Sequence, residues 1–153
     1  MAHRTRQPGT AVIFDMDHSE GTYAAAEFFH SRFERVLIVT PRNSLADLTS
    51  LVSRQGIERR FSEKGIEAIF LSEPRWSDEI EEGRLACVNV YSGREQWIED
   101  VALVAYSTPR APEDALSAVL REAGIAVTLI GDCRSPGEML AATAQGHAAG
   151  NAA

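Results

Sequence analysis

The chain has 153 residues and a formal net charge of −7 at pH 7. Nucleic acids and anionic membranes bind dense basic surfaces, so this charge disfavours both as main partners. Lys64 is the only lysine, which removes most lysine nucleophiles and a P-loop from consideration. No run of about 18 apolar residues occurs, and Cys87 and Cys133 lack a CxxC partner. We therefore expect a cytoplasmic chain with reduced thiols, no structural metal and no membrane span.

The predicted elements alternate between strand and helix along most of the chain. Residues 1–9 are polar and predict a disordered lead-in to a single domain over residues 10–150. Apolar runs rich in branched residues predict buried strands at residues 11–14, 35–40, 66–71, 101–106 and 125–130. Capping residues and amphipathic spacing predict helices that start at Ser19 or Glu20, run from Asn43 or Ser44 to Lys64, and cover residues 113–123 and 136–149.

Residues 66–98 interrupt this alternation. Residues 74–83 are charged and predict a loop, whereas residues 84–91 alternate apolar and polar side chains, as in a half-exposed antiparallel strand. Strands that alternate with helices are typical of a parallel sheet. The predicted fold is therefore α/β, a Rossmann-like parallel sheet with helices on both faces and a small antiparallel insertion.

The first predicted strand ends in Phe14-Asp15-Met16-Asp17. This DxD sequence resembles the opening of haloacid dehalogenase-like phosphatases, which implies Asp15 as the nucleophile and Asp17 as the acid/base, with magnesium. That family places a lysine shortly before its late acidic motif, whereas the only lysine here lies far upstream of the candidate late acid, Asp132. A phosphatase that uses Asp15 and Asp17 is kept as an alternative function.

The same turn can also be interpreted as a dinucleotide site. In a βαβ unit the helix N-terminus faces a pyrophosphate, and glycines let the backbone approach it closely. Here Gly21 is the only glycine of the turn, and the acidic Asp15 and Asp17 would repel phosphates. Thr40 and Arg42 follow the second strand, and Arg42 has the charge to pair with a 2′-phosphate. A Rossmann-like unit without a nucleotide explains this turn at least as well.

The last predicted strand ends in Gly131-Asp132, ahead of the last helix. Flavoproteins with two dinucleotide-binding domains close their FAD domain in this way. The glycine permits close approach, the aspartate accepts a hydrogen bond from a ribityl hydroxyl, and the helix N-terminus faces the pyrophosphate. An aspartate that caps the next helix is the simpler interpretation. The candidate cofactor-binding residues, none of them catalytic or metal-binding, are Asp15, Asp17, Gly21, Thr40, Arg42, Gly131 and Asp132.

Several short sequence pieces, each weak alone, occur in a defined order along the chain. They are Asp15 to Gly21, Val36 to Pro41, Gly65-Ile66, Trp97 to Val104, Arg110-Ala111-Pro112, and Ile130 through Pro136 to Gly150. In this order they resemble the C-terminal part of flavoproteins in the trimethylamine dehydrogenase and dienoyl-CoA reductase group. The N-terminal half of those proteins is a barrel like that of old yellow enzyme. The resemblance runs from about residue 11 to residue 150.

This resemblance implies an NAD-domain-like module followed by the last strand and helix of an FAD-domain-like module. FAD, ADP or NAD(P) are the nucleotides it implies for this region. It implies FMN and an iron–sulfur cluster only in a partner barrel, and residues 1–153 contain neither a barrel nor a four-cysteine motif. We therefore expect an accessory subunit of a split flavin-dependent oxidoreductase, not catalytic alone, that acts with a barrel-type flavoprotein subunit or as a homo-oligomer. A stand-alone binding or regulatory module without redox activity is the alternative.

Overall fold

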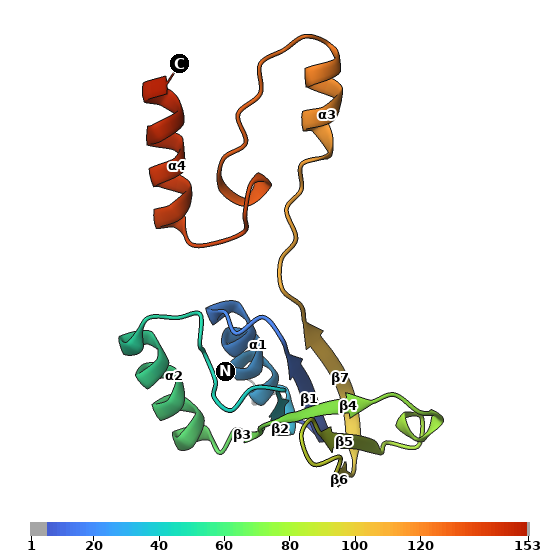
Figure 1. Cartoon of the computed structure of the whole chain (residues 1–153). Helices are drawn as coiled ribbons and strands as arrows, with labels where there is room; N and C mark the ends of the chain where they lie inside the picture. The colour runs from blue at the N-terminus through green and yellow to red at the C-terminus, as the bar shows by residue number, and fades with distance from the viewer. Residues whose placement is uncertain (1–5, 153) are drawn as a thin grey trace. The chain divides into compact units, whose positions relative to one another are not determined.

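The computed structural model describes residues 6–152. These residues form two compact units, of which the first ends at Thr108 and the second begins at Pro109 (Figure 1). The single domain over residues 10–150 remains a prediction from the sequence. Strand β1 (Gln7–Asp15) begins inside the predicted lead-in, and residues 1–5 of that lead-in lie outside the described residues.

The centre of the first unit is a four-stranded sheet in which all neighbouring strands are parallel. Its order is β3 (Glu67–Ile69), β2 (Phe33–Val39), β1 and β7 (Val101–Ser107). The two central strands, β1 and β2, are apolar on both faces because both of their faces are covered, as is usual for parallel sheets. The strands predicted at residues 11–14, 35–40 and 101–106 are therefore confirmed, but the last of them, β7, is half-buried to exposed rather than buried, because it lies at the edge of the sheet.

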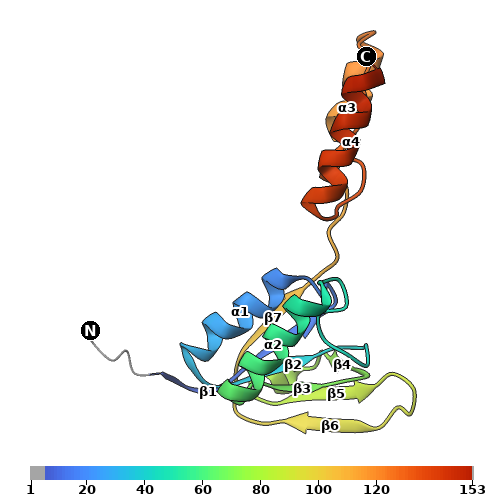
Figure 2. The ribbon, with the colours of Figure 1, turned by 90° about the vertical axis from the view of Figure 1, so that its left-hand side faces the viewer.

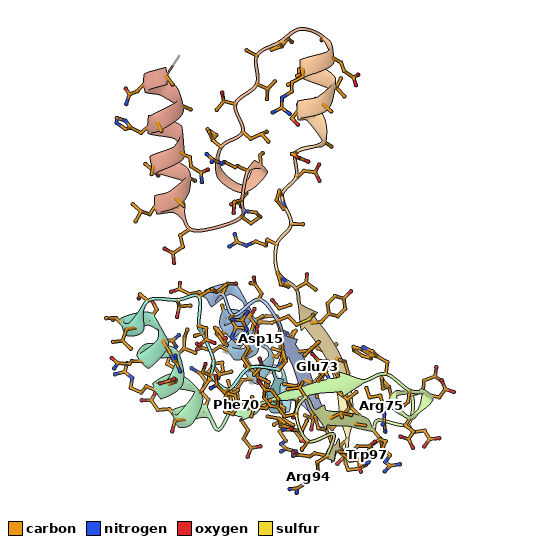
Figure 3. The ribbon with its side chains drawn as sticks, in the orientation of Figure 1. Asp15, Phe70, Glu73, Arg75, Arg94 and Trp97 are labelled. Carbon is orange, nitrogen blue, oxygen red and sulfur yellow. The ribbon has the colours of Figure 1, made fainter. Side chains whose placement is uncertain are left out.

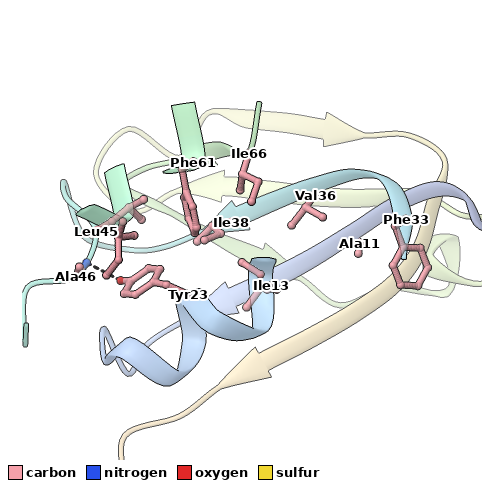
Figure 4. Close-up of a cluster of buried hydrophobic side chains, with 12 residues drawn as sticks. Ala11, Ile13, Tyr23, Phe33, Val36, Ile38, Leu45, Ala46, Phe61 and Ile66 are labelled. Carbon is pink, nitrogen blue, oxygen red and sulfur yellow. Dashed lines mark hydrogen bonds between the residues drawn. The ribbon is translucent and has the colours of Figure 1, made fainter. Parts of the chain in front are cut away.

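Both helices of the first unit contribute to one buried cluster with the sheet. Helix α1 (Glu20–His30) follows β1, and α2 (Leu51–Lys64) follows β2. Their apolar side chains join those of one sheet face (Figure 4). The cluster consists of Ala11, Ile13, Tyr23, Ala26, Phe33, Val36, Ile38, Leu45, Ala46, Ile57, Phe61 and Ile66. Glu27 on α1 also accepts hydrogen bonds from Lys64 and Arg60 on α2, at 2.8 and 2.7 Å. These ion pairs join the two helices directly.

The opposite face of the parallel sheet is covered by an antiparallel sheet of three strands. They are β4 (Ser72–Arg75), β5 (Leu85–Asn89) and β6 (Glu95–Ile98), in that order. A second buried cluster lies between the sheets and consists of Val12, Phe14, Leu37, Val39, Leu85, Cys87 and Ile98. Figure 2 shows α1 and α2 on one side of the parallel sheet and this antiparallel sheet on the other. The Rossmann-like fold with a small antiparallel insertion is confirmed, and within the first unit the insertion covers the second face.

Two boundaries in the first unit differ from the sequence prediction. Helix α2 begins at Leu51 rather than near Asn43, because the side chain of Ser50 accepts a hydrogen bond from the backbone N–H of Ser53 at 3.2 Å and caps the helix there. The segment 74–83, predicted as a loop, contributes the end of β4 and a short 3₁₀ turn, η1 (Asp78–Ile80). Strand β4 was missed because its sequence is polar, whereas the antiparallel strand predicted at residues 84–91 is present as β5.

The second unit contains α3 (Ala115–Glu122), the 3₁₀ turn η2 (Gly131–Cys133) and α4 (Met139–Ala152). The two predicted helices are present, but the strand predicted at residues 125–130 is wrong, because this segment is not in any sheet. An isolated strand has no partner for its backbone hydrogen bonds, so its apolar sequence alone is insufficient. Among residues 6–152, every helix is too short or too polar to cross a membrane.

Candidate functional site

The carboxyl ends of β1 and β2 lie side by side in the parallel sheet, which is where Rossmann-like domains bind ligands. Asp15 ends β1 (Figure 3), and Thr40 directly follows β2. Both residues are completely buried, as is His18 in the turn after β1. The side-chain nitrogen Nε2 of His18 lies 3.0 Å from Oγ1 of Thr40. Buried polar side chains therefore connect the two strand ends.

Asp15 is fully engaged by residues of its own unit. Its Oδ1 accepts a hydrogen bond from the backbone N–H of His18 at 2.9 Å, and its Oδ2 accepts one from the Tyr23 hydroxyl at 2.7 Å. That hydroxyl also accepts a hydrogen bond from the backbone N–H of Ala46 at 2.5 Å (Figure 4). Burial and the hydrogen bond to Asp15 raise the pKa of Tyr23 well above its ordinary value. Tyr23 therefore remains a neutral donor that links β1, α1 and the loop after β2.

His18 lies at the centre of this network in an unusual backbone conformation. Its φ is +56°, in the left-handed region that non-glycine residues rarely adopt. Its Nδ1 has no hydrogen-bond partner and lies 3.9 Å from Oδ2 of Asp15 and 4.0 Å from Oδ2 of Asp47. Burial lowers the pKa of His18 below 6.5, although the nearby Asp15 carboxylate opposes this shift. The imidazole is therefore neutral near pH 7.

The start of α1 carries negative side chains, and its backbone conformation does not require a glycine. Asp17 accepts a hydrogen bond from the Ser19 hydroxyl, and Glu20 lies in the first helical turn. Gly21 has no left-handed φ, and a Cβ added there would lie 3.9 Å from the nearest atom, Oγ of Ser19. An alanine would therefore fit at Gly21, so nothing in the structure requires a glycine there for close ligand approach.

Arg42 is the exposed member of this region. Its side chain is 46% exposed, and its Nη1 lies 4.0 Å from Oδ2 of Asp47. Its backbone N–H donates to Oγ1 of Thr40 at 3.3 Å. The structure therefore brings Asp15, Asp17, Gly21, Thr40 and Arg42 together at one edge of the sheet, but the side chains of Asp15 and Thr40 point inward.

Sequence reasoning missed three members of this network: His18, Tyr23 and Asp47. The histidine within an acidic turn was a usable signal, whereas Tyr23 reads as an ordinary apolar position of an amphipathic helix. The phosphatase alternative needs Asp15 as an accessible nucleophile, yet Asp15 is buried with both oxygens hydrogen-bonded. Within residues 6–152, no group of three or more acidic, histidine or cysteine side chains is arranged to hold a metal ion.

The remaining two predicted site residues lie in the second unit. Gly131 has a φ of +60°, and its N–H donates to Oε1 of Gln145 on α4 at 2.8 Å. The Asp132 side chain is 66% exposed and lies 3.7 Å from Nη1 of Arg110. Its Oδ1 accepts a hydrogen bond from the N–H of Gly137 at 3.3 Å, ahead of α4. The Asp132 carboxylate thus has lone pairs available to a ligand as well as a local structural contact.

Neither a protein-family model nor a curated protein matches the sequence. Solved structures do match. Histamine dehydrogenase from Rhizobium sp. 4-9 has a TM-score of 0.72 and 24% identity, covering 92% of this chain and 22% of that chain. The 6-hydroxypseudooxynicotine amine oxidase from Pseudomonas geniculata N1 has a TM-score of 0.78 and 21% identity, covering 94% and 22%. Thioredoxin reductase from Lactococcus lactis has a TM-score of 0.66 and 17% identity, covering 95% and 52%.

All three sequence identities are below 25%, so these similarities establish the fold of this chain and nothing further. The chain spans about a fifth of the length of the first two proteins. These two are a histamine dehydrogenase and an amine oxidase, both of the trimethylamine dehydrogenase and old-yellow-enzyme-like family. The resemblance expected from the sequence is therefore confirmed at the level of the fold, and the chain has the Rossmann-like architecture of the C-terminal region of that oxidoreductase family.

Proposed function

We propose that this chain is an accessory nucleotide-fold subunit of a split flavin-dependent oxidoreductase, of the amine dehydrogenase or enoate reductase type. Its partner would be a separate barrel-type chain that carries FMN and an iron–sulfur cluster. The observation that supports this proposal is the lack of a core in the second unit. From Pro109 to Ala152, Ser117 is the only buried residue.

The apolar side chains of the second unit are exposed instead. Large apolar residues of α3, α4 and the segment between them contact solvent, and they are Leu116, Val119, Ile125, Ile130, Met139 and Leu140. Exposed apolar surface of this extent is typical of a surface that a partner covers. A unit of this size cannot be stable without burying such side chains.

The segment between α3 and α4 adds a second requirement. No backbone hydrogen bond connects residues 126–130 to another described residue of the second unit. The branched residues of Ile125–Ile130 favour a strand, and unpaired N–H and C=O groups are satisfied when such a strand joins a sheet. The rest of an FAD-type domain in a partner would offer both the sheet and the apolar cover.

In this arrangement Gly131 and Asp132 would lie beside the nucleotide of the partner domain, which could be FAD, ADP or NAD(P). An exposed carboxylate accepts hydrogen bonds from hydroxyl groups but repels phosphates. Asp132 therefore fits the ribityl or ribose portion of such a ligand. When bound in the partner, a flavin would supply the redox chemistry, whereas residues of this chain would position it. We place the complex in the cytoplasm, where the free thiols of Cys87 and Cys133 would stay reduced.

The proposal is tested by purifying the tagged full chain from its native host. We expect a yellow, flavin-containing barrel polypeptide to copurify. The variant Ile130→Asp should lose this partner because it places a charge in the proposed strand. The variant Val52→Asp is the control for an added surface charge, because Val52 is also a branched apolar residue, 79% exposed against 43% for Ile130, but lies on α2 of the first unit. Recovery of only a colourless free chain would refute the proposal.

A homo-oligomer is the other way to cover the second unit. Light scattering of the purified chain measures this directly. A stable dimer whose mass falls to that of a monomer in Ile130→Asp would favour a stand-alone module over a split enzyme. The two outcomes are therefore distinguishable with the same variants.

A further inference from the structure

The Rossmann-like fold implies a nucleotide at the turn between β1 and α1. A pyrophosphate there needs free backbone N–H groups, a positive helix N-terminus and space for close approach. Each requirement can be compared with the residues of this turn. The turn and the residues around it all belong to the first unit.

The backbone donor at the centre of the turn is already used. The N–H of His18 donates to Oδ1 of Asp15 at 2.9 Å, and both residues are completely buried. The turn residue in the left-handed conformation is His18 rather than a glycine. Gly21 has space for a Cβ, so no glycine here clears the way for a phosphate.

The charge of the turn is also opposite to what a phosphate requires. Asp17 precedes α1 and Glu20 lies in its first turn. Carboxylates interact favourably with the helix dipole at this end, where a bound anion would otherwise lie. Asp47 lies 4.0 Å from the His18 ring and from Nη1 of Arg42. Arg54 lies closer to this carboxylate, at 3.4 Å, so both Arg42 and Arg54 already have Asp47 as a partner.

The space between the strand ends is filled by the protein itself. The His18 ring is buried against Thr40, and its unpartnered Nδ1 faces the carboxylates of Asp15 and Asp47. Tyr23 holds the backbone at Ala46 by a hydrogen bond. The loop after β2 is thereby fastened to α1, beside the turn.

We infer that the chain's own Asp15–His18–Tyr23 network occupies the pyrophosphate position of this fold, so that the first unit binds neither NAD(P) nor ADP. The residues present do not fit the nucleotide that the fold implies. The network instead supplies, from within the chain, the polar contacts that a ligand would otherwise supply at this edge. The first unit then has a structural role, and any nucleotide would be held elsewhere.

The experiment uses the ¹⁵N-labelled full chain with NADH, NADPH and ADP up to millimolar concentration. We expect no saturable chemical-shift change at residues 15–22 or 40–47, and slow hydrogen exchange of the His18 amide with and without ligand. Saturable shifts at those residues, or fast exchange of that amide, would overturn the inference. Shifts confined to residues 131–137 agree with it, because they report the second unit.

A charge-neutral variant separates the internal network from simple surface repulsion. Asp17→Asn combined with Glu20→Gln removes two negative charges but leaves Asp15, His18 and Tyr23 intact. We expect this variant also to show no binding of ADP at residues 15–22. Saturable ADP binding at those residues in the variant would show that surface charge alone excludes the nucleotide, and the inference would be wrong. Copurification of a flavoprotein partner is a separate readout, so the two proposals can fail independently.

Discussion

The network around Tyr23 predicts a large effect for the loss of a single oxygen atom. In Tyr23→Phe the ring, which packs edge-on against Phe61 with centroids 5.9 Å apart, is retained. The hydroxyl is lost, so Oδ2 of Asp15 loses its donor and the N–H of Ala46 loses its acceptor. Asp15 and Ala46 are completely buried, and each buried group left unsatisfied costs about 1–3 kcal/mol. For the two groups together we therefore expect a loss of about 2–6 kcal/mol in the free energy of unfolding.

Urea unfolding followed by circular dichroism measures this loss, and an unchanged slope would show that the effect is on stability. Tyr106→Phe is the control, because Tyr106 is 69% exposed on β7. We expect it to change the free energy of unfolding by less than about 0.5 kcal/mol. If Tyr23→Phe were equally mild, the network would not be stabilising this edge of the sheet, and the reasoning would be refuted.

Three further predictions follow from other features of the first unit. Burial lowers the pKa of His18 and His30 in the folded protein, whereas both side chains protonate near pH 6.5 when the chain is unfolded. The free energy of unfolding should therefore be maintained above pH 6.5 and decrease below it, because the unfolded chain binds more protons. This decrease should be smaller in His18→Asn. Gly21→Ala should raise stability by about 0.5–1 kcal/mol in urea unfolding, since the site has helical geometry and space. Gly9→Ala should lower the free energy of unfolding by about 1–3 kcal/mol, because the new Cβ would lie 2.7 Å from the Asp100 carbonyl oxygen. An unchanged urea midpoint would contradict this prediction.

Much of the fold follows from local sequence. The central strands β1 and β2 were predictable because burial on both faces demands uninterrupted apolar runs. The end of α2 was predictable because Gly65 adopts φ +67°, which favours glycine. Strand β4 was not predictable, since its sequence Ser72–Arg75 is polar and its pairing with β5 is a tertiary contact.

The candidate site was less accessible from sequence than the fold. Asp15 and Asp17 were identified from the acidic turn after the first predicted strand, and Thr40 and Arg42 from their place after the second, where a dinucleotide-binding unit holds its ligand. The orientation of these side chains was not predicted. The inward direction of the Asp15 side chain depends on its hydrogen bond to Tyr23, which lies eight residues further along the chain. The strand predicted at residues 125–130 is wrong for a different reason. Its sequence favours a strand, but the described residues of the second unit contain no strand that pairs with it.

The exposed apolar surface of the second unit has a consequence for how much of this protein a cell can hold. Chaperones and proteases recognise apolar segments and unpaired backbone of the kind found around Ile125–Ile130. Under the proposed function, copies made in excess of the partner would be degraded first. The amount of this chain would therefore follow the supply of its partner rather than its own rate of synthesis, and balanced production of both would be part of assembling the enzyme.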